Sequence, residues 1–204
     1  MSSLRNIFFI LILCISSLLH AQMPEAVKAS EEYRVQMNED FRDPEESPLE
    51  KEDLENFDGL EFFVIDTTYI VEAEFVRTPS ESPFEMQTST SRTSTYVKYG
   101  ELYFSLKGKE FMLNLYQNQN LRSDPEYFDY LFLPFTDETN GISTYEGGRY
   151  LDFSIPEEKR VTIDFNRAYN PYCAYSGRYS CPIPPKENHL ETAIPAGVKK
   201  FTKN

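Results

Sequence analysis

The residues with the greatest chemical potential gather near the end of the chain, in the stretch from Ile163 to His189, IDFNRAYNPYCAYSGRYSCPIPPKENH. It holds two cysteines, two arginines, two carboxylates and three asparagine amides. Its prolines fix φ and remove backbone donors, so the segment cannot complete a sheet ladder. Side chains must therefore hold it in place, either as a structural cross-link or as the frame of a binding site.

The two cysteines of this stretch, Cys173 and Cys181, have seven residues between them. In an oxidising compartment an even pair favours a disulfide that closes a small loop. A zinc site would need four ligands, often with cysteines two to four apart. We therefore expect a disulfide and neither a metal nor a cofactor. A buried, unpaired role for the cysteines is the alternative.

Polar groups at the ends of predicted strands form a second candidate site. Arg149 alternates with apolar residues and shares their face, where its charge needs a partner. That partner is either a carboxylate (Asp137, Asp152 or Asp164) in a structural ion pair, or an anionic group that Arg149 and Arg167 bind together. The candidate residues for binding a small polar or anionic ligand are Asp137, Arg149, Tyr150, Asp164, Asn166, Arg167, Tyr169, Asn170 and Glu187.

Catalysis is the third chemical interpretation, and the sequence contains no nucleophile elbow, zinc-binding His-Glu-x-x-His helix or phosphate-binding loop. A serine triad would have to use His189. Carboxylate pairs such as Asp137 with Glu138, or Asp164 with Glu187, could perform acid/base hydrolysis. With 33 acidic residues in the chain, such pairs arise easily by chance. A ligand-binding module is favoured over an enzyme; the alternatives are a hydrolase and a purely structural or interaction protein.

The first 21 residues have the plan of a secretory signal peptide, with Arg5 followed by an apolar run and a short polar tail. The run is too short to span a membrane as a helix. We expect export to the periplasm or the extracellular space, with no membrane association after the signal is removed. The expected organisation is a signal peptide at 1–21, a helical arm at 22–58 and a β domain at 59–204 with a Pro-rich C-terminal loop, a single domain overall.

The chain is acidic, with a formal net charge of −13. This charge repels phosphate backbones and anionic lipid head groups, and no cluster of lysines and arginines overrides it. We therefore expect no nucleic-acid partner.

Periodicity predicts an amphipathic helix over residues 26–41, with Ser30 as an internal cap and Pro44 and Pro48 beyond its end. A short helical turn is expected over LEKEDLENF. From Leu60 onward the apolar period changes to two, which is typical of strands. Strands are expected at residues 69–77, 84–90, 95–99, 102–106, 111–115, 130–135, 149–153 and 160–165, with a hairpin turn at Lys107-Gly108-Lys109. This pattern predicts a mainly β, antiparallel meander that closes into a barrel or, alternatively, forms a two-sheet sandwich.

Three blocks of the chain resemble the bacterial family named domain of unknown function 1684: SPLEKEDLENFDGLEFFVIDTTYIVEA, FTDETNGISTYEGGRYLDF and TIDFNRAYNPYCAYSGRYSCPIPPKENHLETAIPAG. The specific part is Asn-Arg-Ala-Tyr-Asn-Pro with its downstream Cys-Pro and Glu-Asn. The resemblance covers most of the chain after residue 21. The family has no assigned activity, so the resemblance implies the extent of the domain and no substrate.

Overall fold

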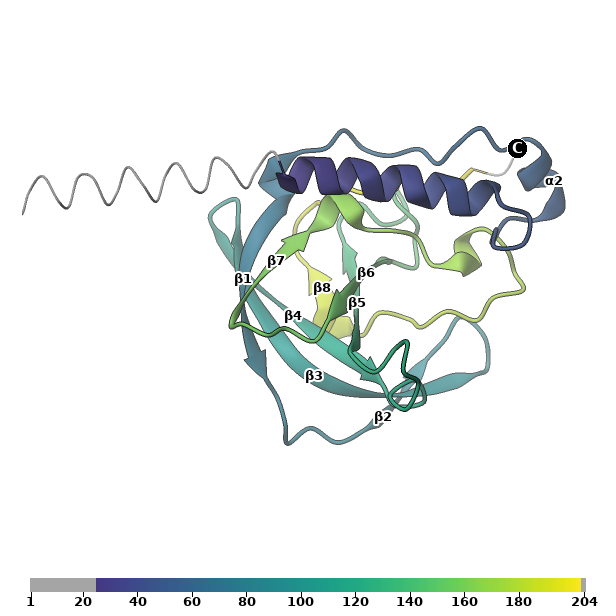
Figure 1. The fold of residues 1–204 in the computed structure, drawn as a ribbon. Helices are drawn as coiled ribbons and strands as arrows, with labels where there is room; N and C mark the ends of the chain where they lie inside the picture. The colour runs from purple at the N-terminus through teal and green to yellow at the C-terminus, as the bar shows by residue number, and fades with distance from the viewer. Residues whose placement is uncertain (1–24, 203–204) are drawn as a thin grey trace, which may run out of the picture.

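The computed structural model of the chain describes residues 25–202, so the predicted signal peptide at 1–21 lies outside the described residues. The prediction of a mainly β protein with a helical arm is confirmed. Eight strands form one curled sheet, a half-barrel, with helix α1 (residues 25–42) lying across one end of it (Figure 1). The strands are β1 (Ile70–Arg77), β2 (Phe84–Gln87), β3 (Thr93–Leu106), β4 (Lys109–Asn118), β5 (Tyr130–Asp137), β6 (Arg149–Ser154), β7 (Arg160–Asp164) and β8 (His189–Leu190).

The order of strands along the sheet is β6-β5-β4-β3-β1-β7, with β2 paired to β3 and β8 paired to β5. All pairs are antiparallel except β5 with β8, which is parallel. The predicted hairpin is confirmed, because β3 ends at Leu106 and β4 begins at Lys109. The turn between them places Lys107 and Gly108 at positive φ, as the favoured two-residue hairpin turns require.

The two short strands expected at 95–99 and 102–106 are one long strand, β3. Its register with β4 shifts between Lys98 and Gly100, which marks a β-bulge rather than a break. A Cβ built on Gly100 would lie 2.3 Å from the ring of Phe75, so only glycine permits this approach to β1. The chain makes no turn at Gly100, because it bends there without leaving the sheet.

Helix α1 confirms the predicted amphipathic helix, and helix α2 (Lys51–Glu55) confirms the second helical turn. Ser30 is not the expected cap, because it lies within α1. Its Oγ donates to Ala26 O at 3.0 Å and to Asp164 Oδ2 at 2.5 Å, so this buried serine attaches the helix to the end of β7. Near the C-terminal end of α1, Phe41 and Met37 pack in a cluster that includes Tyr175 and Val198.

Strand β5 and the first half of β6 bury both of their faces, and this places the candidate site. Leu131, Leu133 and Leu151 point into the main core inside the half-barrel. The alternate residues Phe132 and Tyr150 point the other way, into a second cluster that contains Met86, Tyr96, Tyr116 and Cys181. Because side chains alternate along a strand, Asp152 shares the face of Tyr150. The second cluster therefore lies between the sheet and the segments that cover its outer face.

Four short 3₁₀ helices shape those covering segments: η1 (Thr67–Tyr69), η2 (Phe165–Arg167), η3 (Tyr172–Ala174) and η4 (Lys186–Asn188). In Figure 1 the chain after β7 runs as an irregular green-to-yellow segment beside α1 and along the sheet. None of it forms a long strand, in agreement with its prolines.

Candidate functional site

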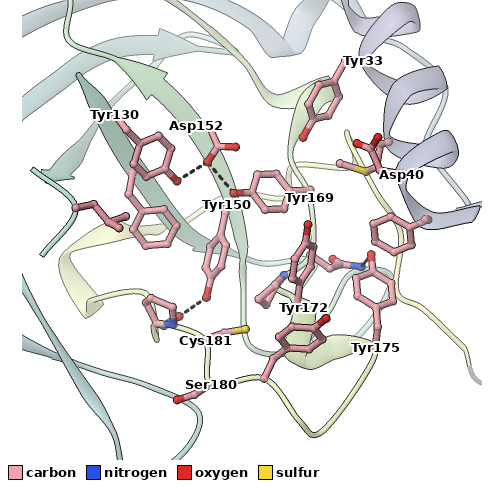
Figure 2. Close-up of a pocket in the computed structure, with 18 of the residues that line it drawn as sticks. Tyr33, Asp40, Tyr130, Tyr150, Asp152, Tyr169, Tyr172, Tyr175, Ser180 and Cys181 are labelled. Atoms are coloured by element: carbon pink, nitrogen blue, oxygen red, sulfur yellow. Dashed lines mark hydrogen bonds between the residues drawn. The ribbon is translucent and has the colours of Figure 1, made fainter. Parts of the chain in front are cut away.

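A pocket of about 560 Å³ lies between α1, the outer face of β5 and β6, and the loop after β7. We call it the tyrosine pocket, because eight tyrosines and two phenylalanines make up half of its lining residues. Figure 2 shows how its side chains are arranged. This volume is within the usual range for small-molecule sites. Its lining residues are Tyr33, Gln36, Met37, Asp40, Phe41, Tyr96, Leu121, Tyr130, Phe132, Tyr150, Asp152, Tyr169, Asn170, Pro171, Tyr172, Tyr175, Tyr179, Ser180, Cys181 and Pro182.

The carboxylate of Asp152 is the best-defined polar group of the pocket. The hydroxyls of Tyr130 and Tyr169 each donate to its Oδ1 at 2.7 Å (Figure 2). Its other oxygen, Oδ2, has no hydrogen-bond partner within residues 25–202. Two tyrosines therefore fix the direction of the carboxylate while one oxygen stays available to a ligand.

The tyrosines that face Asp152 keep their protons. Burial raises the pKa of Tyr130 and of Tyr169 above the ordinary value, and the charge of Asp152 raises both further. The pKa of Tyr33 on α1 is raised for the same two reasons, although the Arg167 guanidinium opposes the shift. A neutral hydroxyl is the form that donates to a carboxylate, so Tyr130 and Tyr169 can both donate to Asp152 at neutral pH.

Tyr150 and Tyr169 join the sheet to the Asn-Arg-Ala-Tyr-Asn-Pro loop. Their backbones form an antiparallel bridge, with Tyr150 N to Tyr169 O at 2.9 Å and Tyr169 N to Tyr150 O at 3.0 Å. The hydroxyl of Tyr150 donates to the carbonyl of Pro182 on the far side of the loop. One side chain therefore spans the pocket wall from β6 to the segment around Cys181.

Two buried asparagines hold the same loop. The Asn166 amide donates to Asp66 O at 3.0 Å, and its Oδ1 accepts from Asp66 N at 3.0 Å. The Asn170 Nδ2 donates to Lys199 O at 2.9 Å and to the hydroxyl of Tyr175 at 3.4 Å. Both asparagines, predicted as candidate ligand-binding residues, make backbone connections, and only Asn170 also lines the tyrosine pocket.

Arg149 and Asp137, which were candidates for ligand binding, lie in the core instead. Their side chains are fully buried, and Arg149 Nη2 is 2.7 Å from Asp137 Oδ2. The guanidinium also donates to the carbonyls of Ala196 and Ile194. This is the structural ion pair that was the alternative to anion binding. A ligand in the tyrosine pocket cannot reach Arg149, because that side chain points to the opposite face of β6 from Tyr150.

Asp164, Arg167 and Glu187 are the remaining predicted residues, and the structure does not bring them into the tyrosine pocket. Asp164 receives hydrogen bonds from Ser30 and Asn166. Arg167 is exposed, with its guanidinium 4.8 Å from the ring centre of Tyr33. Glu187 is exposed in η4. Of the nine predicted ligand-binding residues, Tyr150, Tyr169 and Asn170 therefore line the tyrosine pocket.

The cysteines lie at one side of the pocket as free thiols, so the predicted disulfide is not formed in the structure. Cys181 is buried and lines the pocket, whereas Cys173 is half-buried and does not. The backbone N–H of Cys173 donates to Cys181 Sγ at 3.2 Å, and the hydroxyl of Tyr145 lies 3.7 Å from Cys173 Sγ.

Sequence reasoning missed Tyr33, Asp40 and Tyr130, and considered Asp152 only as an ion-pair partner. Their signal was present in part, because Tyr130-Phe132 and Tyr150-Asp152 alternate with leucines and so define a second buried face. The contribution of α1 had no such signal, since Tyr33 and Asp40 look like ordinary residues of an amphipathic helix.

The described part of the chain also limits other kinds of site. None of the helices within residues 25–202 combines the length and apolar character that a membrane span requires. In the same range, no group of three or more His, Cys, Asp or Glu side chains is arranged to hold a metal ion.

Comparison with known proteins places the fold in a family. No curated protein matches the chain. Among solved structures, the chain is similar to an uncharacterised protein of Haloarcula marismortui determined by solution NMR, with 34% sequence identity and a TM-score of 0.69 over 88% of this chain and 96% of that one. The model of the family described as "Protein of unknown function (DUF1684)" matches residues 55–199, a range that contains every strand and the loop after β7. The chain therefore belongs to the DUF1684 family, as its sequence motifs predicted.

Proposed function

We propose that the protein is an exported binding module whose tyrosine pocket takes a small organic cation, such as an amine or a quaternary ammonium compound. The observation that carries this proposal is the carboxylate of Asp152, an exposed residue that two tyrosine hydroxyls orient at a pocket lined by many aromatic rings. An ammonium group gains from both features, because it pairs with a carboxylate and is attracted to the faces of aromatic rings.

The charge of the pocket supports a cation over an anion. Among the described residues that line it, the charged ones are Asp40 and Asp152, and both are acidic. The net charge of the chain, −13, has the same sign and favours the approach of cations. The sequence had pointed to a small polar or anionic ligand because of Arg149 and Arg167. Arg149 is paired in the core and Arg167 lies outside the pocket, so the polar part of that hypothesis remains and its anionic part loses support.

A hydrolase that uses a carboxylate pair was the alternative function. Neither of the two predicted pairs, Asp137 with Glu138 or Asp164 with Glu187, lines the tyrosine pocket. Asp137 is moreover committed to Arg149. Binding is therefore the function that the geometry supports best.

Export is part of the proposal and rests on residues 1–21, whose composition matches a signal peptide. The acidic net charge, with no cluster of lysines and arginines, is compatible with an exported protein in the periplasm or outside the cell.

The test compares ligands of one shape and different charge. Choline is titrated into the protein by calorimetry, together with 3,3-dimethylbutan-1-ol, its uncharged carbon isostere, and 3,3-dimethylbutanoate, a related anion. We expect choline to bind about tenfold or more tightly than the neutral isostere, which corresponds to about 1.4 kcal/mol and lies between the values for cation–π contacts at exposed and at desolvated sites. Equal binding of all three, or tighter binding of the anion, would contradict the proposal.

A matched pair of variants locates the site. Asp152→Asn removes the charge and keeps an oxygen that Tyr130 and Tyr169 can donate to, so we expect weaker choline binding with the fold retained. Glu157→Gln removes one negative charge at an exposed position outside the pocket and should leave the affinity unchanged. Equal affinity for choline in Asp152→Asn and in the unmodified protein would place the ligand elsewhere.

A further inference from the structure

Cys181 lines the tyrosine pocket, and together with Cys173 it forms a site whose chemistry does not depend on cation binding. Eight positions apart in the sequence, they are brought together by η3 and the turn that follows it. The N–H of Cys173 donates to Cys181 Sγ at 3.2 Å, and Cys173 packs against the cluster of buried residues that contains Cys181. Two free thiols in this arrangement are in reach of one another without any rearrangement of the sheet.

The two thiols differ in access. Cys173 is half-buried and is the more exposed residue of the two. Cys181 is 8% exposed and is enclosed by the second cluster of buried residues. Its backbone N–H donates to Ser89 Oγ at 3.1 Å and its carbonyl accepts from Ser89 N at 2.8 Å, which fixes it against the end of β2. A more exposed cysteine therefore lies next to a protected one.

The two thiols also differ in acidity. Hydrogen bonding from the Cys181 thiol lowers the pKa of Cys173 to about 6, against the opposing effect of partial burial, and the Tyr145 hydroxyl lowers it further. The same interaction raises the pKa of Cys181. Burial raises the pKa of Tyr145 itself, so its hydroxyl keeps the proton that it donates toward the thiolate. At neutral pH the sulfur of the more exposed cysteine is thus the nucleophilic thiolate, and the protected one carries the proton.

We propose that Cys173 and Cys181 are the nucleophilic and the resolving thiol of a thiol–disulfide exchange site whose substrate is a small-molecule disulfide. In the first step, the Cys173 thiolate attacks one sulfur of the substrate, a Cys173–substrate S–S bond forms, the substrate S–S bond breaks, and one thiolate leaves. In the second step, Cys181 Sγ attacks Cys173 Sγ, and the second half of the substrate leaves as a thiol with the proton from Cys181. The two protein thiols are oxidised to a disulfide and the substrate is reduced to two thiols.

The division of roles follows from the geometry. A resolving thiol has to be close to the nucleophile and shielded from direct attack, and Cys181 meets both conditions. The nucleophile reacts best when its pKa is near the ambient pH. A purely structural pair would not require one cysteine to be more exposed and hydrogen-bonded by a tyrosine.

The test uses the full-length mature protein, reduced and freed of reductant, with bis(2-hydroxyethyl) disulfide as the probe and intact-mass measurement as the readout. The unmodified protein should lose two hydrogen atoms and release two equivalents of 2-mercaptoethanol. Cys181→Ser should stop at a stable adduct on Cys173, whereas Cys173→Ser should react at least about tenfold more slowly, because its remaining thiol is buried and protonated. Accumulation of a stable adduct on the unmodified protein would overturn the proposal, and so would equal or faster reaction of Cys173→Ser.

The pH dependence provides a second test that needs no substitution. The rate of alkylation of Cys173 by iodoacetamide, followed by peptide mass spectrometry, should rise with a midpoint near 6. An ordinary cysteine titrates at about 8.5, and a midpoint there would remove the assignment of Cys173 as the nucleophile. Choline binding is not involved in either measurement, so failure of this proposal is distinguishable from failure of the proposed cation site.

Discussion

Arg149 and Asp137 neutralise one another inside the half-barrel, with 2.7 Å between Nη2 and Oδ2 and with both side chains fully buried. Burial lowers the pKa of Arg149, and the neighbouring Asp137 opposes that shift. The pair, together with the carbonyls of Ala196 and Ile194, links β5 and β6 to the C-terminal segment. An ion pair without solvent contact is stabilised by its geometry, and loss of either member leaves an uncompensated charge.

We expect Arg149→Ala to reduce the free energy of unfolding by about 3–5 kcal/mol, because Asp137 would remain buried without a partner. Urea denaturation measures this change. Arg160→Ala, at an exposed position of β7, is the matched control and should change stability by less than about 0.5 kcal/mol. The double variant Arg149→Met with Asp137→Leu should be more stable than Arg149→Ala, since it removes both charges. Equal stability of Arg149→Ala and the control would exclude a structural role for the pair.

The two loop asparagines should act on the loop more than on the sheet. Asn166→Ala removes both contacts with Asp66, and Asn170→Ala frees Lys199 O. Each loss should cost about 1–3 kcal/mol locally, because a buried backbone group becomes unsatisfied. Hydrogen exchange should show faster opening over residues 168–187, while residues 102–115 of the hairpin stay protected. Equal loss of protection in both regions would contradict a separately held loop.

Alkaline conditions should destabilise the folded protein through the buried tyrosines of the tyrosine pocket. Burial is the main cause of the raised pKa values of Tyr33, Tyr130, Tyr150 and Tyr169, so the folded state binds protons that unfolded tyrosines release at a pKa of about 10. Their contribution is therefore complete below about pH 10 and decreases as the pH rises above it toward the raised values. Phenolate absorbance and circular dichroism should change together in this range. Ionisation of these tyrosines in a protein that keeps its circular dichroism would contradict the expectation.

The predicted signal peptide leads to a direct expectation for the mature chain. If residues 1–21 are removed on export, Edman sequencing of the protein recovered from the periplasm or the medium starts at Gln22. The substitution Ile10→Arg, within the apolar run, should keep the protein in the cytoplasm, because it interrupts the hydrophobic region of the signal. Recovery of the intact chain beginning at Met1 outside the cytoplasm would refute cleavage.

Local sequence patterns were sufficient to predict the helices and most of the strands. The spacing of apolar residues predicted α1, and alternation predicted the hairpin of β3 and β4. The bulge at Gly100 joined two expected strands into one, since nothing local distinguishes a bulge glycine from a turn glycine. Strand β8 was not predicted, because His189–Leu190 is defined by parallel pairing with Thr136 and Asp137, more than fifty positions away. The expected number of strands, eight, is correct, but two of the expected strands are one strand and β8 takes the remaining place.

The candidate site was predictable only where it lay within one segment. The Asn-Arg-Ala-Tyr-Asn-Pro motif led to Tyr169 and Asn170, which do line the tyrosine pocket. Tyr33 and Asp152 are more than a hundred residues apart, and their proximity depends on how α1 lies on the sheet. Alternation gives the face of the sheet on which Arg149 lies and not its neighbour on that face. The sequence alone therefore does not distinguish a carboxylate partner from an anionic ligand.

Helix α1 supplies one wall of the tyrosine pocket, whereas the family model begins only at residue 55. The sheet, the buried ion pair and the loop after β7 thus form a scaffold, and a helix outside the matched range completes the tyrosine pocket. Substitutions at Tyr33, Gln36, Met37 or Asp40 alter the pocket without touching the core of the half-barrel. If the tyrosine pocket binds a ligand as proposed, substitutions in this helical arm can change the ligand preference while the packing of the β domain is retained.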